Sequence, residues 1–413
     1  MAEREIAVFE AFTVSARKSS SLDAGNVIVG KHAAMSEPSF AIPEQAVPGP
    51  DATYYPQLDG LRAIAVMSVF IGHLVPLRFL QKIVSWGDTG VILFFCLSGF
   101  LITRILLRVQ IDGTGNRWMS LRSFYVRRVL RIFPIYYLVI VLGVLVGYPP
   151  VRDQFLRLVT YSLNVPGLPP TDHLGAFSHF WSLSVEEQFY LFWPMLVLFL
   201  PRRNLPHFIV GLIGLSLGYR LAFALAGASY KLIFASLWGC LDSLGLGALL
   251  AIAWDEPSCR WARGRRFVRV GKIFGVVWAL MTVGILAGGL DSEFTGYLWF
   301  AAVYFTTAAI AFTGLIAFAL SGSKNWWGKF LESWLMVRLG RISYGLYVYH
   351  FFFPYLLLWL VGHRYVRLTS AWHYAGWSIC GSLVVALLSW RFIEKPILNL
   401  KRHFRYDEGR RAA

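Results

Sequence analysis

The sequence is poor in charge and in cysteine for its 413 residues. Charged residues make up 15% and hydrophobic residues 56% of the chain, whereas soluble proteins average about 25% charged residues. The four cysteines form neither a CxxC pair nor a Cys/His spacing of the kind that binds zinc. The composition therefore favours a membrane protein with several spans, and it predicts neither redox chemistry nor a bound metal.

Motifs typical of soluble enzymes and of nucleic-acid binders are also missing. The sequence has no Gly-rich nucleotide loop, no GxSxG turn and no HExxH helix. Its net charge of +16 comes without a basic aromatic face or a nucleic-acid-binding motif, so nucleic acid is not an expected partner. The basic residues gather instead in short connections between apolar runs, as they do on the cytoplasmic side of membrane proteins.

Ten apolar runs are candidates for membrane spans, each of which needs about 20 mostly apolar residues. We therefore predict an all-α polytopic membrane protein with about ten transmembrane helices. The predicted spans are residues 61–77, 87–109, 132–146, 180–200, 208–225, 232–254, 274–290, 297–320, 342–361 and 374–392.

Basic residues in the connections indicate the orientation. If the amino terminus is cytoplasmic, nineteen Lys and Arg residues fall in the cytoplasmic connections and seven in the opposite ones, which fits the positive-inside rule. We expect a multi-pass protein of the inner (cytoplasmic) membrane with both termini in the cytoplasm. Residues 1–52 are expected to be a disordered cytoplasmic extension, residues 53–398 the transmembrane domain and residues 399–413 a basic cytoplasmic tail.

Arg62 and His73 lie on the first predicted span. They are eleven residues apart, or almost three helical turns, so their side chains share one face about 16 Å apart along the axis. Ionisable residues are costly in hydrocarbon and usually face a protein or water-filled interior. Asp59, three residues before Arg62, can pair with it. A lone histidine on an apolar face is more often structural, but the shared face favours a catalytic role for His73.

Two further groups have both a functional and a structural interpretation. Ser98 can hydrogen-bond a ligand, or it can simply allow a close approach of helices together with Gly99. Arg127, Arg128 and Arg131 lie within little more than one turn at the cytoplasmic boundary. Arginine forks suit phosphate groups, although the same cluster would also anchor a helix at an anionic lipid surface.

Two adjacent carboxylates, Glu186 and Glu187, open the fourth predicted span. Neighbouring helical residues point about 100° apart, so the two are not expected to serve one face. One would orient a histidine or a sugar hydroxyl, and the other would pair with an arginine. The other polar residues of this region are Ser184, Gln188 and Tyr190, with His179 about two turns earlier.

The later spans carry fewer polar residues. Tyr344, Tyr347 and His350 recur every three residues and make a polar stripe along the ninth predicted span. Asp242 lies in the sixth predicted span. Arg220 in the fifth is a possible partner for one of the membrane carboxylates, and such an ion pair would be structural.

Six segments, in this order, resemble the acyltransferase-3 family of integral membrane acyltransferases. They are YPQLDGLRAIAVMSVFIGH, FFCLSGFLIT, FYVRRVLRIFPIYY, FWSLSVEEQFYLFWP, GRISYGLYVYH and RFIEKP, and the resemblance covers residues 55–398. It implies ten membrane helices and transfer of an acyl group, commonly acetyl from acetyl-CoA. The acceptor is commonly a hydroxyl of a cell-surface glycan or its lipid-linked precursor, and some members instead modify lipo-oligosaccharides or macrolide antibiotics.

The resemblance also has one departure. Many members carry an arginine two residues before the aspartate of the sixth span, whereas Cys240 takes that place before Asp242. This puts a family-typical ion pair in doubt. The residues that match the family's arginine and histidine, its arginine cluster and its glutamate motif are Arg62, His73, Arg128, Arg131, Glu186 and Glu187.

Together these observations predict a membrane O-acyltransferase. His73 would act as general base or carry the acyl group. The other residues expected to be catalytic are Arg62, Glu186 and Glu187. Acyl-CoA, foremost acetyl-CoA, would bind through Arg127, Arg128, Arg131 and Ser98. The residues expected to bind substrate or support the structure are Asp59, Ser184, Gln188, Tyr190, Asp242, Tyr344 and His350. The expected partners are the lipid bilayer, the acyl-CoA donor and a glycan or lipid-linked acceptor.

Two other classes of protein remain open. A transporter or flippase would also place polar residues at membrane depth, but it would turn over no thioester. A membrane scaffold would need no chemistry, and the Arg, His and Glu residues in apolar spans argue against it.

Overall fold

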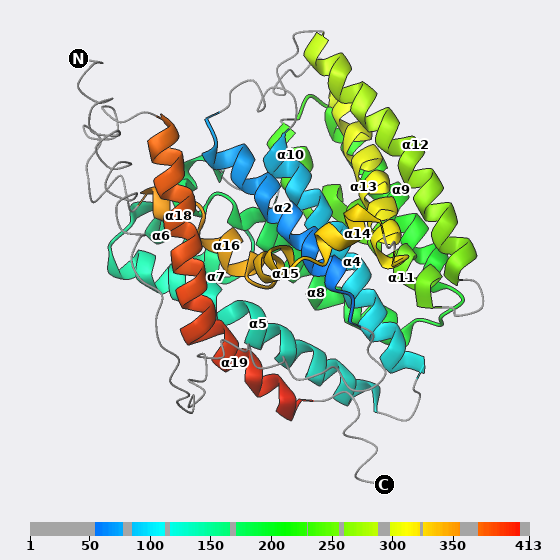
Figure 1. Ribbon diagram of the computed structural model, residues 1–413, viewed down its shortest axis with the longest axis horizontal. Helices are drawn as coiled ribbons and strands as arrows, with labels where there is room; N and C mark the ends of the chain where they lie inside the picture. The colour runs from blue at the N-terminus through cyan, green and yellow to red at the C-terminus, as the bar shows by residue number, and fades with distance from the viewer. Residues whose placement is uncertain are drawn as a thin grey trace, which may run out of the picture. The chain divides into compact units, whose positions relative to one another are not determined.

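The computed structural model describes residues 54–76, 85–111, 116–165, 171–228, 230–255, 260–287, 298–322, 325–355 and 371–404. Within these ranges the chain is helical and contains no strand (Figure 1). The long helices are α2 (Pro56–Leu74), α4 (Trp86–Ile111), α5 (Arg117–Leu145), α8 (Phe180–Phe199), α9 (Leu205–Leu225), α11 (Leu237–Asp255), α12 (Arg260–Ala287), α13 (Leu298–Leu320) and α18 (Ala371–Ser389). The short elements are α6 (Pro149–Asp153), α7 (Phe155–Val159), η2 (Thr171–Phe177), α10 (Tyr230–Ala235), α14 (Trp326–Leu331), α15 (Trp334–Arg341), α16 (Ser343–Tyr349), η4 (Trp390–Glu394), α19 (Lys395–Asn399) and η5 (Leu400–His403).

Seven of the described helical stretches are long and apolar enough to cross a membrane. They are α4, α5, α9, α11, α12, α13 and the stretch from α18 to η5. A helix satisfies its backbone hydrogen bonds internally, which is what a span through hydrocarbon requires. The prediction of an all-α polytopic membrane protein is therefore confirmed, and the number of ten spans stays a prediction.

Several predicted spans take a different form in the structure. The third, residues 132–146, is the end of the much longer helix α5, so the three arginines before it lie within that helix. The sixth is divided at Ser236 into α10 and α11. In the ninth, the regular helix α16 ends at Tyr349, and residues 356–370 lie outside the described part of the chain. The predicted extension 1–52 and most of the predicted tail also lie outside it.

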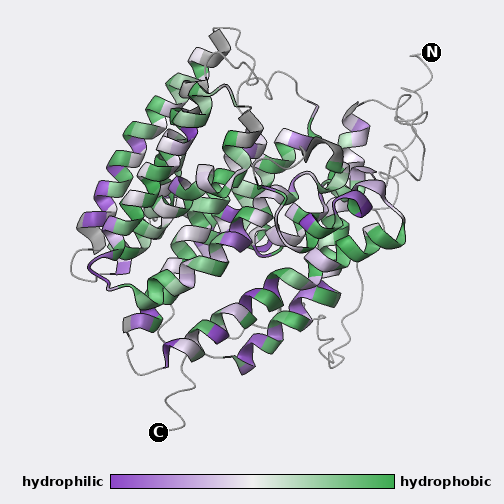
Figure 2. Cartoon of the chain, turned by 180° about the vertical axis from the view of Figure 1, so that it is seen from behind, coloured by the Kyte–Doolittle hydropathy of each residue, from purple (hydrophilic) through white to green (hydrophobic). Residues whose placement is uncertain are grey.

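Helix α12 shows which surfaces suit contact with lipid. The side chains of Ile273, Val276, Leu280 and Val283 are exposed on it. Figure 2 shows α12 purple at its arginine-rich end and largely green beyond. Apolar side chains on an outward face fit hydrocarbon, and basic residues at one end fit the membrane surface.

Helix α4 packs closely against α2 and α11 (Figure 1). Its approach to α11 depends on two glycines. A Cβ atom on Gly99 would clash with the carbonyl oxygen of Leu244, and one on Gly247 would clash with the carbonyl oxygen of Cys96. The close approach expected from Gly99 is therefore present, and it places the neighbouring Ser98 against α8.

The two glycines give a test of this packing. We expect Gly99→Ala and Gly247→Ala to lower the stability of the detergent-solubilised protein by about 1–3 kcal/mol, because the added methyl group forces the helices apart. Gly214→Ala on α9 is the matched control, since a Cβ there meets nothing within 4 Å and alanine favours the helix. Thermal unfolding measures all three. Equal melting temperatures would show that the close approach is dispensable.

Candidate active site

A narrow cavity of about 90 Å³ lies between α2, α4, α5, α8 and α16. The cavity brings together eight of the residues predicted to form the site, although they come from five helices. They are Arg62, Ser98, Arg128, Arg131, Glu186, Glu187, Tyr190 and Tyr344. The other predicted residues, which lie elsewhere, are Asp59, His73, Arg127, Ser184, Gln188, Asp242 and His350.

Three arginines give the cavity its positive charge. Arg62 is held by Asp59, whose Oδ1 atom accepts a hydrogen bond of 2.9 Å from Nη1. Arg128 lies over the ring of Tyr190, with its guanidinium carbon 5.3 Å from the ring centre. Neither Arg128 nor Arg131 forms an ion pair with a carboxylate in the part of the chain that the structure describes. Their charge is therefore open to an anionic ligand.

Two glutamates from α8 lie in the same cavity. Ser98 donates a hydrogen bond of 2.6 Å to Oε1 of Glu186, and the Tyr190 hydroxyl donates to Ser98 at 3.1 Å. Oε1 of Glu187 is buried, and none of the described residues bonds to it. Although neighbouring side chains of a helix point about 100° apart, Glu186 and Glu187 both line this one cavity. Glu186 is thus held by a hydrogen bond, while one carboxylate oxygen of Glu187 remains without a hydrogen-bond donor among the described residues.

The histidines form a second cluster next to the cavity. Nδ1 of His73 lies 3.1 Å from Nε2 of His350, and His179 packs against His350 with ring centres 4.6 Å apart. Tyr347 connects the histidine cluster to the cavity: it lines the cavity, and its hydroxyl donates to the carbonyl oxygen of His179 at 3.2 Å. His73 itself is exposed near the end of α2 rather than deep inside the bundle. It is therefore reached from outside the arginine-lined cavity.

Three predicted site residues bond to other parts of the fold. Arg127 donates to the carbonyl oxygens of Lys401 and Phe404, at 3.4 and 3.0 Å, and so ties α5 to the carboxyl-terminal segment. Ser184 donates to the carbonyl of Phe180 in its own helix at 3.1 Å. Gln188 is bonded to Asn164 and to the Tyr161 carbonyl. The contacts of Arg127 and Gln188 tie α5 and α8 to other segments, whereas that of Ser184 stays within α8.

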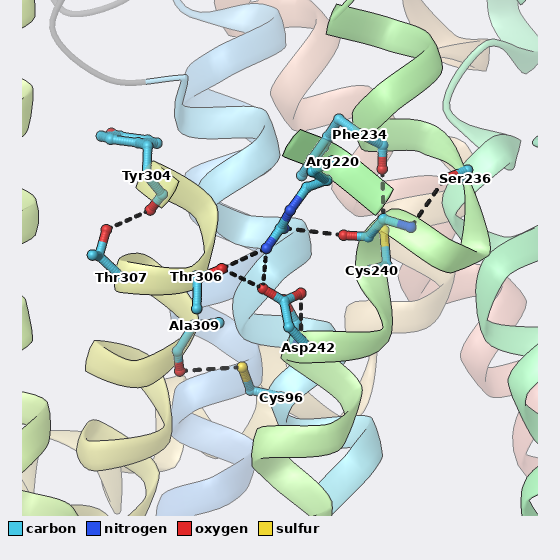
Figure 3. Close-up of polar contacts among 12 residues, drawn as sticks. Cys96, Arg220, Phe234, Ser236, Cys240, Asp242, Tyr304, Thr306, Thr307 and Ala309 are labelled. Carbon is cyan, nitrogen blue, oxygen red and sulfur yellow. Dashed lines mark hydrogen bonds and ion pairs between the residues drawn. The ribbon is translucent and has the colours of Figure 1, made fainter. Parts of the chain in front are cut away.

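Asp242 forms a buried ion pair away from the cavity (Figure 3). Nη2 of Arg220, from α9, lies 2.5 Å from Oδ2 of Asp242, and the hydroxyl of Thr306 donates to the same oxygen at 2.9 Å. The side chains of Arg220 and Asp242 are 1% and 0% exposed. Cys240 stands where many relatives are expected to have the arginine, and its thiol donates to the Phe234 carbonyl. The neighbouring helix supplies the cation instead.

The contacts of His179 could not be predicted from its position in the sequence. It lies about two turns before the glutamates, a spacing that assigns it to no partner. Its Nε2 atom is 3.1 Å from the carbonyl oxygen of Val348, which is 169 residues away in the chain. Only the folded arrangement of α8 and α16 brings these groups together.

The described residues contain no group of three or more His, Cys, Asp or Glu side chains that could hold a metal ion. The side chains of the site have chemistry of their own. A carboxylate bonded to a hydroxyl, a second carboxylate with a spare acceptor and an exposed histidine are groups that orient or accept protons. Arginines bind anions such as phosphate.

Comparisons with known proteins agree with this chemistry. Residues 55–391 match a family model described as an acyltransferase domain. The chain is 29% identical over 365 residues to O-acetyltransferase OatA of Staphylococcus aureus (strain NCTC 8325 / PS 47), covering 83% of this chain and 57% of that protein. It is 30% identical over 364 residues, with the same coverage, to the putative O-acetyltransferases SACOL0978 and SAS0844 of S. aureus strains COL and MSSA476. The chain thus spans a little over half the length of these curated relatives. No solved structure matches it.

The buried ion pair gives a second test. Asp242→Ala leaves the Arg220 charge buried without its carboxylate, so we expect a loss of about 3–5 kcal/mol in stability. The double variant Arg220→Leu/Asp242→Ala removes both charges and should be more stable than Asp242→Ala alone. Asp255→Ala is the matched control: its partner Arg202 is 37% exposed, so the cost should stay near 1 kcal/mol or less. Melting temperatures in detergent measure the stability of each variant. A double variant that is less stable than Asp242→Ala alone would contradict the pairing of Arg220 with Asp242.

Proposed function

Because the chain belongs to the acyltransferase-3 family, we propose that it is a membrane O-acyltransferase of the inner membrane. It moves an acyl group, foremost acetyl, from acyl-CoA to a hydroxyl of a cell-surface polysaccharide, a lipid-linked glycan or another glycoside. The S. aureus relatives, which are named as O-acetyltransferases, support acetyl as the group transferred. The observation that carries the proposal is the shared cavity of Arg128, Arg131 and the Ser98–Glu186 pair.

The donor binds at the arginine end of the cavity. Two guanidinium groups that form no ion pair with a carboxylate among the described residues offer planar forks of donors that match phosphate oxygens. The cavity volume of about 90 Å³ is well below the roughly 300 Å³ or more of pockets that enclose drug-sized ligands. The nucleotide therefore stays at the mouth, and only the thin pantetheine arm with its thioester enters. Arg127 is engaged with the carboxyl-terminal segment, so it supports α5 from outside the cavity.

The acceptor reacts at His73. The exposed position of His73 near the end of α2 lets a large glycan approach, while Arg62 lies about 16 Å away along the same helix. His73 takes the proton of the acceptor hydroxyl as the oxygen attacks the thioester carbonyl carbon. With the arginine end in the cytoplasm and both termini on that side, donor and acceptor meet from opposite ends of α2.

Loss of His73 tests the catalytic assignment. We expect His73→Ala to abolish ester-linked acylation when it is expressed in a strain from which the native gene is deleted. The other two histidines of the cluster, His179 and His350, are buried and would not replace it. Mass spectrometry of surface glycans and lipids, at matched protein levels, measures the missing acyl mass and identifies the acceptor. His207→Ala, at an exposed position on α9, is the control and should acylate normally. Normal acylation by His73→Ala would overturn the assignment.

The donor site makes a separate prediction. Arg128→Gln and Arg131→Gln should each raise the KM for acetyl-CoA by about 10- to 100-fold, since a charge-assisted hydrogen bond contributes about 1.5–3 kcal/mol. Release of the CoA thiol by purified protein in lipid nanodiscs measures this. Arg122→Gln, at an exposed position on the same helix, should leave KM unchanged. A wild-type protein that turns over no acetyl-CoA would instead favour the transporter class.

A further inference from the structure

Three histidines meet beside the cavity, and they come from distant parts of the chain. His73 lies near the end of α2, His179 precedes α8 and His350 follows α16. The rings of His73 and His350 are stacked with centres 5.2 Å apart, and His179 lies edge-on to His350 at 4.6 Å. His73 is exposed, whereas His350 and His179 are buried. The cluster thus joins one accessible imidazole to two that the protein encloses.

The end of α16 decides which nitrogen of His350 carries a hydrogen. Carbonyl groups in the last turn of a helix lack their usual backbone donors, and Tyr347 lies in the last turn of α16, which ends at Tyr349. Nδ1 of His350 is 2.5 Å from the carbonyl oxygen of Tyr347. A carbonyl oxygen only accepts hydrogen bonds, so Nδ1 is the donor. In neutral His350, Nε2 therefore carries a lone pair.

The assignment at His350 determines the tautomer of His73. Nε2 of His350 and Nδ1 of His73 are 3.1 Å apart, and because Nε2 accepts, Nδ1 of His73 donates. The lone pair of His73 is then on its other nitrogen, Nε2. No described carboxylate is hydrogen-bonded to either ring, and His350 is buried, where an uncompensated charge is costly, so its ring is neutral at rest.

Gly87, at the start of α4, packs against the edge of the His73 ring that carries Nε2. A Cβ atom on Gly87 would lie 2.9 Å from Nε2 and 3.1 Å from Cε1, so any larger residue would press on this edge of the ring. None of the described residues forms a hydrogen bond with Nε2. The Nε2 lone pair is therefore not taken up by any described residue.

We infer that His350 is a positioning residue for acyl transfer: it holds His73 in the Nδ1–H tautomer and so presents Nε2 to the acceptor hydroxyl. The inference rests on the proposed function. As Nε2 takes the hydroxyl proton, the hydroxyl oxygen bonds to the thioester carbonyl carbon and the carbon–sulfur bond breaks. The proton then passes to the departing CoA thiolate. His350 does not touch the reacting atoms, and its bond to the Tyr347 carbonyl keeps it oriented throughout.

Nitrogen NMR tests the tautomer without any need for turnover. Protein labelled with ¹⁵N-histidine in lipid bilayers should show a His73 signal with a protonated Nδ1 and a bare Nε2, identified by its loss in His73→Gln. In His350→Phe, which removes the acceptor, the signal should shift toward the Nε2–H form. His350→Gln should retain it, because the amide oxygen accepts from Nδ1–H. His207→Phe is the control and should change nothing.

Release of CoA thiol from acetyl-CoA by the same proteins tests the consequence. In His350→Phe, kcat should fall about tenfold or more, within the roughly 10²- to 10⁴-fold that a general base contributes. The KM for acetyl-CoA should stay unchanged, because the arginines are untouched. His350→Gln should recover most of kcat. Gly87→Ala should lower kcat while the tautomer signal of His73 remains, because it covers Nε2 without touching His350.

The two measurements separate two kinds of failure. If the wild-type protein turns over no acetyl-CoA, the proposed function is wrong, and the NMR signal still decides whether His350 sets the tautomer of His73. A bare Nδ1 on His73 in the wild type, or wild-type kcat in His350→Phe, overturns the role of His350. If kcat falls equally in His350→Phe and His350→Gln and the KM for acetyl-CoA rises, His350 has a packing role, and the inferred positioning role is overturned as well.

Discussion

The close packing of α4 against its neighbours is the constraint on which the candidate site depends. Gly99 lets the backbone of α4 approach α11, and in that position Ser98 reaches Glu186 of α8. At the other end of α4, Gly87 lies against the ring of His73 on α2. These contacts join α4 to α11, α8 and α2. If α4 lay farther from its neighbours, all of them would be lost. Small residues at helix interfaces thus have a direct chemical consequence here.

Charged side chains inside the membrane domain occur in two arrangements. Arg220 and Asp242 neutralise each other, and Thr306 donates a hydrogen bond to the carboxylate, so both charges are compensated within the protein. Arg128 and Arg131 instead face a cavity without a carboxylate partner among the described residues. Burial of charge is expensive unless it is compensated. The first arrangement is therefore structural, while the second underlies the proposed anion site.

Much of the site could be predicted from local patterns. The spacing of Arg62 and His73 places them on one helix face, because a helix has a fixed period. The adjacent glutamates could also be recognised, since two carboxylates are rare in an apolar span. Their common cavity could not, because the helical period separates Glu186 from Glu187 and only the packing around α8 reunites them. The sequence does not indicate which membrane carboxylate pairs with Arg220, because nothing in it orients α9 toward α11.

The sequence by itself determined the all-helical membrane class and the family, because hydrophobic length, charge distribution and short motifs are local properties of the chain. It also determined which residue types were available for chemistry. Only the tertiary structure decided which of them meet. The contact between His73 and His350 joins residues 277 positions apart, and no periodicity extends across several helices. Its geometry depends on how α2 and α16 pack, and on a helix end that frees the Tyr347 carbonyl to accept from an imidazole.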